Sequence, residues 1–213
     1  FDYDVFFQTF SKIKNLAVEL KNLGYEVNHL DLGGGFGVDY TMKNSLNYKS
    51  FSKALNEVFK NNEFQLSIEP GRSLIAESGV LLTRVIRTKS TNYKNFLIVD
   101  AAMNNLIRPT LYNAIHSIQP LKIKSNRSSK TYDIVGPICE TGDFLGIDFN
   151  LQETKKNEVL AIMTCGAYGS VMRSNYNSRP SAAEVFIFNN KEILLRKREK
   201  IDQLLNLDII PNF

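Results

Sequence analysis

The sequence predicts a two-part fold, with an α/β region over residues 1–77 and a mostly antiparallel β region over residues 78–213. Helical and strand-like segments alternate in the first region, an order typical of parallel strands joined by helices. After about residue 78 the apolar segments become short and are separated by polar turns, as in antiparallel sheets. The chain has 213 residues, of which 43% are hydrophobic and 23% charged, so it can bury a substantial core.

The first region contains two predicted helix–strand pairs. Apolar residues recur at helical spacing over residues 6–20, and a strand over 24–32 follows and ends at a run of glycines. A second amphipathic face spans residues 51–59, and the strand expected over 64–72 stops at Pro70. This order predicts parallel strands whose carboxyl ends lie at one edge.

The second region reads as a series of strands and one final helix. An amphipathic helix is expected over residues 198–207, and there is no internal repeat. The expected strand segments are 79–89, 95–103, 131–139, 158–169 and 183–190.

Composition excludes several classes of function. The net charge of +4 comes from scattered lysines and the terminal cluster 194–200, which is typical of a solvated helix face and not of a nucleic-acid site. No apolar segment is long enough to span a membrane, and residues 1–23 do not resemble a secretion signal. Cys139 and Cys165 lie in separate motifs without metal-ligand or disulfide spacing, so we expect no metal site and a reducing, cytoplasmic environment.

Two predicted strands of the first region end in motifs that can bind an anion. The segment "DLGGGFG" contains Gly33, Gly34 and Gly35, and a loop without side chains presents N–H groups that suit a phosphate. The same glycines could form only a turn. In "EPGR", Glu69 could pair with a cationic nitrogen and Arg72 could bind a phosphate or a carboxylate, whereas the alternative is a surface ion pair.

Three motifs of the second region contain further candidates. In "RPTLYNAIH", Arg108 and Tyr112 could converge on a small acid, or Arg108 could be an ordinary surface residue. In "GPICETGD", Cys139 stands beside acidic residues in an expected loop, where a thiol can transfer a proton; Cys165, inside an apolar strand, is expected in the core.

The third motif is "GAYGSVMRSNYNSRP", which follows a predicted strand. Tyr168 lies at the end of that strand, where its phenol could donate a hydrogen bond to a phosphate. Tyr176 and Arg179 are expected to be structural turn and surface residues.

Taken in order, these five motifs resemble the diaminopimelate decarboxylases, pyridoxal-phosphate enzymes that make lysine from meso-diaminopimelate. The resemblance covers nearly the whole chain and implies a fold like that of ornithine and arginine decarboxylases. It implies that residues 1–77 are the last part of a (β/α)8 barrel that carries the cofactor, and that residues 78–213 are the C-terminal β domain. It also implies a homodimer with active sites shared between subunits.

The resemblance assigns roles to individual residues. Glu69 would pair with the pyridine nitrogen of pyridoxal phosphate, Cys139 would donate a proton from the partner subunit, and Glu140 would recognise the distal ammonium group of the substrate. A glutamate after the cysteine favours diaminopimelate over ornithine. The implied cofactor-binding residues are Gly33, Gly34, Gly35, Glu69, Gly71, Arg72 and Tyr168, and the implied substrate-binding residues are Arg72, Arg108, Tyr112, Glu140 and Tyr168.

Two elements of the family pattern have no counterpart in this sequence. The family has a cofactor-binding lysine and an H-x-G-S histidine before the glycine loop, but here the only histidines are His29 and His116. We therefore expect the chain to be the C-terminal half of the enzyme, inactive and poorly soluble alone. It could come from a split or truncated gene, it could be a decayed reading frame, or it could be a non-catalytic homologue that binds or regulates a decarboxylase.

Overall fold

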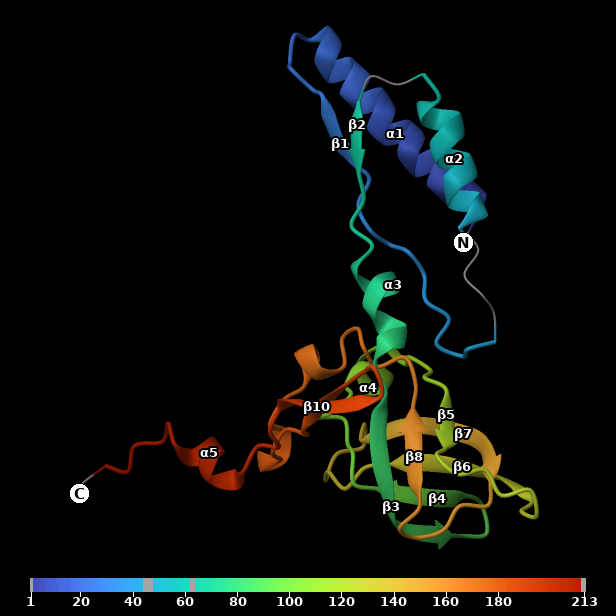
Figure 1. The fold of residues 1–213 in the computed structure, drawn as a ribbon, viewed down its shortest axis with the longest axis vertical. Helices are drawn as coiled ribbons and strands as arrows, with labels where there is room; N and C mark the ends of the chain where they lie inside the picture. Colours follow the sequence, from blue (N-terminus) through green and yellow to red (C-terminus); the bar gives the residue numbers. More distant parts are fainter. Residues whose placement is uncertain (1, 44–47, 62–63, 212–213) are drawn as a thin grey trace. The chain divides into compact units, whose positions relative to one another are not determined.

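The computed structural model describes residues 2–43, 48–61 and 64–211. The chain divides into two compact units, Phe1–Ala76 and Glu77–Phe213 (Figure 1). Each unit has its own hydrophobic core.

The first unit has the predicted alternation of helices and strands. The carboxylate of Asp2 caps the first helix by accepting the N–H of Asp4 at 3.0 Å, and Gly24, at φ +92°, follows its last turn. β1 and β2 pair in parallel, with His29 opposite Gln65. The elements are α1 (Tyr3–Asn22), β1 (His29–Asp31), α2 (Lys49–Phe59), β2 (Gln65–Ser67) and α3 (Gly71–Ile75).

Phenylalanine side chains form the centre of the first unit. α1 and α2 pack against each other (Figure 1), and the rings of Phe10 and Phe51 meet edge to face with their centroids 5.4 Å apart. Phe36, which follows the glycine run, stands 4.7 Å from the Phe51 ring and is 5% exposed. The glycine segment is therefore anchored to the helix pair by a buried aromatic side chain.

The second unit is mostly sheet. Six strands hydrogen-bond in the order β5-β8-β3-β4-β6-β7, and every neighbouring pair is antiparallel except β4 and β6. The two end strands of this order, β5 and β7, also contact each other, so the sheet is a nearly closed barrel. The strands are β3 (Leu81–Ser90), β4 (Asn95–Val99), β5 (Ile118–Pro120), β6 (Ser129–Val135), β7 (Phe144–Gln152) and β8 (Val159–Ile162).

Short helical segments and a hairpin complete the second unit. β9 and β10 form an antiparallel two-stranded sheet of their own, and apolar side chains of both strands, such as Phe186 and Leu194, are exposed. The remaining elements of this unit are the helices α4 (Arg108–Tyr112) and α5 (Ile201–Leu205), the strands β9 (Glu184–Phe188) and β10 (Lys191–Arg196), and the 3₁₀ turns Ser170–Met172 and Tyr176–Ser178. A further 3₁₀ turn, Ala76–Ser78, begins at the last residue of the first unit.

An ion-pair cluster fixes the connection into β8. Glu158 accepts hydrogen bonds from Arg127 at 2.6 Å, from Lys124 at 2.8 Å and from the N–H of Lys155 at 2.9 Å. The Arg127 guanidinium, with help from Lys124 and that N–H group, lowers the pKa of Glu158 to about 2. The carboxylate therefore stays ionised well below the usual range of glutamate.

The sequence prediction is incomplete in the second unit. β5, β7 and β10 were not expected as strands, and α5 has five residues where a helix over 198–207 was predicted. The predicted mostly antiparallel character of this region is confirmed.

Candidate active site

The glycine run and "EPGR" lie together at the carboxyl ends of the two parallel strands. The ladder continues past β1 and β2, because Leu32 N–H donates to the Ser67 carbonyl at 2.9 Å and Glu69 N–H donates to the Gly33 carbonyl at 2.9 Å. The prediction that these two motifs share one edge is therefore confirmed within the first unit.

The backbone of the loop explains why three glycines follow one another. Gly33 and Gly35 have φ angles of +72° and +79°, which residues with a side chain rarely adopt. Gly34 lies against the neighbouring strand end, and a Cβ atom there would come 2.5 Å from the carbonyl oxygen of Glu69. The Asp31 carboxylate steadies the turn by accepting the N–H of Gly33 at 2.7 Å.

The loop is therefore a backbone surface without side chains, which suits a phosphate group. Within the described parts of the chain, no hydrogen-bond acceptor is found for the N–H groups of Gly34 and Gly35. Glu69 is exposed beside them, and Gly71 and Arg72 open the short helix α3, where Arg72 is half-buried.

Arg108, in the second unit, is a buried cation and not an ordinary surface arginine. It is 7% exposed at the start of α4, where Pro109 occupies the first turn. Its guanidinium carbon stands 5.9 Å from the centre of the Tyr112 ring and 5.8 Å from the centre of the Tyr168 ring. The structure thus brings three predicted substrate-binding residues together around one guanidinium group.

Two groups that the sequence did not single out as functional lie behind Arg108. His116 is fully buried; its Nε2 lies 3.4 Å from Arg108 Nε and its Nδ1 lies 3.0 Å from the Met163 carbonyl oxygen. Cys165 Sγ is 3.9 Å from the same Nδ1, and burial raises the pKa of this thiol to about 12. Cys165 is therefore a core residue, as predicted, although it follows β8, which ends at Ile162, and does not lie inside the strand.

One buried carboxylate, that of Asp143, fixes the base of the loop that carries Cys139 and Glu140. Asp143 is 4% exposed and accepts the N–H of Ile138 at 2.6 Å and the N–H of Met103 at 2.7 Å. Cys139 and Glu140 themselves are exposed at the tip of the loop. The rigid base and the exposed tip suit a loop whose side chains act on a bound molecule.

The same loop lies next to α4. Thr110 of α4 donates a hydrogen bond from Oγ1 to the Gly142 carbonyl at 2.5 Å. A Cβ atom at Gly142 would come 2.6 Å from Thr110 Cγ2, so the glycine permits this contact. The "RPTLY" and "CETGD" motifs are therefore neighbours in one chain.

Tyr176 is an exposed residue of the 3₁₀ turn Tyr176–Ser178, as the sequence predicts, and Arg179 directly follows this turn. The Tyr176 hydroxyl donates to Glu140 Oε2 at 3.1 Å, and this bond raises the pKa of Tyr176. Arg179 is half-buried and donates to the Asp100 carbonyl at 2.7 Å. No signal in the sequence linked Tyr176 to Glu140, because the two residues are 36 positions apart.

Tyr168 lies in the loop after β8, which ends at Ile162, and not at the end of a strand as predicted. In this loop the backbone of one segment packs directly on the backbone of another. Tyr168 itself has a φ angle of +58° and is 43% exposed. Just before it, a Cβ atom at Gly79 would come 2.5 Å from the Cα atom of Gly166. Gly169 also packs on the carbonyl of Cys165 without room for a side chain.

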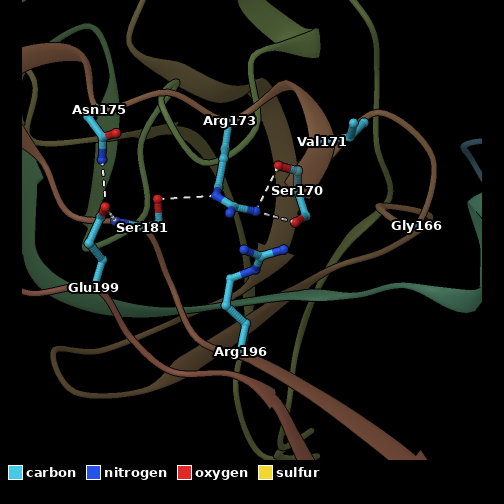
Figure 2. Close-up of a pocket in the computed structure, with 8 residues that line it drawn as sticks. All are labelled: Gly166, Ser170, Val171, Arg173, Asn175, Ser181, Arg196 and Glu199. Carbon is cyan, nitrogen blue, oxygen red and sulfur yellow. Dashed lines mark hydrogen bonds between the residues drawn. The ribbon is translucent and has the colours of Figure 1, made fainter.

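A polar pocket of about 540 Å³ follows this loop, and Figure 2 shows the side chains that line it. Arg173 donates to Ser170 and to Ser181, and Asn175 donates to Glu199 at 2.7 Å. Outside the pocket lining, Oε1 of Glu184 in β9 accepts a hydrogen bond from the Arg173 guanidinium at 2.9 Å and another from Arg196 Nε of β10 at 2.7 Å. Since its charges are paired internally, we assign this network a structural role that ties the hairpin to the loop after Tyr168.

The described residues contain no helix that is long and apolar enough to cross a membrane. Across residues 2–43, 48–61 and 64–211, no three histidine, cysteine or acidic side chains are arranged to hold a metal ion.

Comparison with known proteins assigns this chain to a family. The family described as "Pyridoxal-dependent decarboxylase, C-terminal sheet domain" matches residues 3–166. The chain belongs to this family of pyridoxal-dependent decarboxylases.

Its relatives are more specific. Diaminopimelate decarboxylase of Aquifex aeolicus is 41% identical over 211 residues, covering 98% of this chain and 50% of the relative. That of Vibrio cholerae is 43% identical over 206 residues, covering 96% of this chain and 49% of the relative. The chain thus spans about half the length of the curated relatives it matches.

Solved structures agree with this assignment. Diaminopimelate decarboxylase from Helicobacter pylori complexed with L-lysine matches with a TM-score of 0.88 and 35% identity over 97% of this chain and 51% of that chain. The enzyme from M. jannaschii in co-complex with L-lysine matches with a TM-score of 0.90 and 33% identity over 99% of this chain and 49% of that chain.

Proposed function

We propose that this chain forms the C-terminal half of a diaminopimelate decarboxylase, which converts meso-2,6-diaminopimelate to L-lysine and carbon dioxide with pyridoxal phosphate as cofactor. The observation that carries the proposal is the buried Arg108 between Tyr112 and Tyr168, in a chain whose Cys139 loop lies against the same helix. The identity to named relatives supports the substrate assignment.

The first unit would be the last part of a (β/α)8 barrel that binds the cofactor. Its glycine loop fits a phosphate, because the close contact of Gly34 with Glu69 leaves only backbone at the strand ends. When bound, pyridoxal phosphate supplies an electron sink for the carbanion that remains after carbon dioxide departs. Glu69 would hold a proton on the pyridine nitrogen, and the phosphate-binding set would be Gly33, Gly34, Gly35, Gly71, Arg72 and Tyr168.

The second unit would bind and protonate the substrate. Arg108 and Tyr112, with Arg72 or without it, would bind a substrate carboxylate, since a guanidinium can form two parallel hydrogen bonds to it. Glu140 would pair with the distal ammonium group, and the Tyr176 hydroxyl would orient that carboxylate. Cys139 would transfer the proton of its thiol to the carbon that has lost carbon dioxide.

The complete enzyme would be a cytoplasmic homodimer in which the Cys139 loop of one subunit enters the site of the other. The exposure of Cys139 and Glu140 at the loop tip supports this arrangement.

The proposal is tested with a chimera in which this chain replaces the matching half of the Aquifex aeolicus enzyme. We expect the purified chimera to release carbon dioxide from meso-diaminopimelate, while the Cys139→Ala chimera retains cofactor absorbance and loses most of the rate. Release from ornithine or arginine instead would overturn the substrate assignment. A folded chimera that binds pyridoxal phosphate and decarboxylates none of these substrates would contradict the proposal and favour a binding or regulatory homologue.

A further inference from the structure

Arg108 is a cation that has been removed from water, and such a group needs partners that hold it in place. A buried guanidinium without fixed hydrogen bonds is costly, and it would sample several orientations. The aromatic rings of Tyr112 and Tyr168 stand about equally far from its guanidinium carbon, but ring faces do not fix rotation about the side chain. A directional acceptor at Nε restrains this rotation.

His116 supplies that acceptor, because both of its neighbours require the same proton arrangement. The Met163 carbonyl can only accept, so Nδ1 at 3.0 Å must carry the proton. Arg108 Nε can only donate, so Nε2 at 3.4 Å must present its lone pair. Both contacts are satisfied by one neutral tautomer, and neither is compatible with the other tautomer.

The surroundings keep the imidazole neutral. His116 is fully buried, and this burial lowers its pKa, as does the charge of Arg108. Cys165 beside Nδ1 is a neutral thiol that donates to the Ile162 carbonyl at 3.2 Å, so it does not compete for the Nε2 lone pair.

We infer that His116 is a positioning residue for substrate binding: its Nε2 holds Arg108 in the orientation in which the terminal nitrogens of the guanidinium bind the substrate carboxylate. This inference rests on the proposed function. Since Arg108 would contact a carboxylate in the bound substrate and in the transition state alike, loss of the His116 contact weakens binding more than turnover.

The kinetic test uses the active chimera with His116→Leu and His116→Gln. Leucine removes the acceptor, whereas the glutamine oxygen can replace Nε2. We expect H116L to raise KM for meso-diaminopimelate about tenfold with kcat changed less than about twofold, and H116Q to stay within about threefold of the wild-type KM. Equal KM values for wild type and H116L, or equal losses in H116L and H116Q, would overturn the inference.

A second measurement does not depend on activity. The chain has two histidines, so ¹⁵N-detected imidazole spectra of the chain, with His29→Gln for assignment, report on His116 alone. We expect a neutral ring protonated at Nδ1 near pH 7. A ring protonated at Nε2, or at both nitrogens, would overturn the inference even if the chimera were inactive, whereas an inactive wild-type chimera with the expected spectrum would count against the proposed function alone.

Discussion

Removing the carboxylate of Asp143 should lower the stability of the second unit, and the size of the loss can be estimated from the two hydrogen bonds that Asp143 accepts. Asp143 is 4% exposed, and its two oxygens accept the N–H groups of Met103 and Ile138 at 2.7 Å and 2.6 Å. A hydrogen bond to a charged group contributes about 1.5 to 3 kcal/mol, and the N–H groups of buried Ile138 and half-buried Met103 would both lose their acceptor. We therefore expect Asp143→Ala to lower the free energy of unfolding by about 3 to 5 kcal/mol.

Asp143→Asn should remove one of these two hydrogen bonds and keep the other. The amide keeps one acceptor oxygen but turns an N–H₂ group toward the other backbone donor, so we expect a loss of about 2 kcal/mol. Asp148→Asn is the matched control, since Asp148 has a 69% exposed side chain and a φ angle of +56° that asparagine tolerates. Its effect should stay within about 0.5 kcal/mol.

Urea unfolding followed by far-UV circular dichroism and tyrosine fluorescence measures these differences, because the chain has nine tyrosines and no tryptophan. A D143A variant within about 1 kcal/mol of the wild type, at an unchanged dependence on urea, would refute the reasoning. It would mean that water or a shifted loop satisfies both donors.

Three further outcomes are expected. Gly34→Ala should weaken pyridoxal phosphate binding by the chimera at least about tenfold in a fluorescence titration, because its Cβ atom would meet the Glu69 carbonyl oxygen at 2.5 Å; unchanged affinity would contradict the phosphate role of the loop. Ionised Glu158 contributes stability above its ordinary pKa of 4.5, and this contribution is lost as the pH falls toward its pKa of about 2 in the folded protein. Glu158→Gln should therefore make the melting temperature fall less steeply between pH 4.5 and pH 2 than it does in the wild type. Melting-temperature curves of the two proteins that run parallel over this range would argue against this role of Glu158. Tyr176→Phe should raise KM for meso-diaminopimelate about threefold while leaving the melting temperature within about 2 °C, because it removes only the hydroxyl that orients Glu140; an unaltered KM would assign the bond no role.

The local patterns of the first unit were sufficient to predict its elements. The apolar spacing of its helices and the stop at Pro70 specify helix–strand pairs, and parallel strands place their carboxyl ends at one edge. The joint position of Gly34 and Glu69 follows from that topology alone.

The missed strands of the second unit lack such patterns. β7 contains Asp148 in a left-handed conformation and pairs with β6 through register shifts, so its alternation of buried and exposed residues is broken. β10 is exposed along its whole length and offers no alternation to detect.

The site was predicted as separate motifs, and its connections were not predictable. Contacts such as Thr110 with Gly142, or Tyr176 with Glu140, join segments more than 30 positions apart. The predicted topology of the second unit does not specify which of these distant side chains meet, so the supporting roles of Asp143 and His116 became visible only in the fold.

The contact between Gly79 and Gly166 restrains how this chain can change over generations of mutation. The φ angle of Gly79 does not lie in the left-handed region, so this position could accept an alanine as far as its own backbone is concerned. The neighbouring segment prevents it, since a Cβ atom at Gly79 would come 2.5 Å from Gly166 Cα. A substitution at Gly79 therefore requires the two segments to separate, and that separation would displace Tyr168, which follows Gly166 closely in the chain. A change at Gly79 that removes no side-chain contact would in this way act on the ring that faces Arg108.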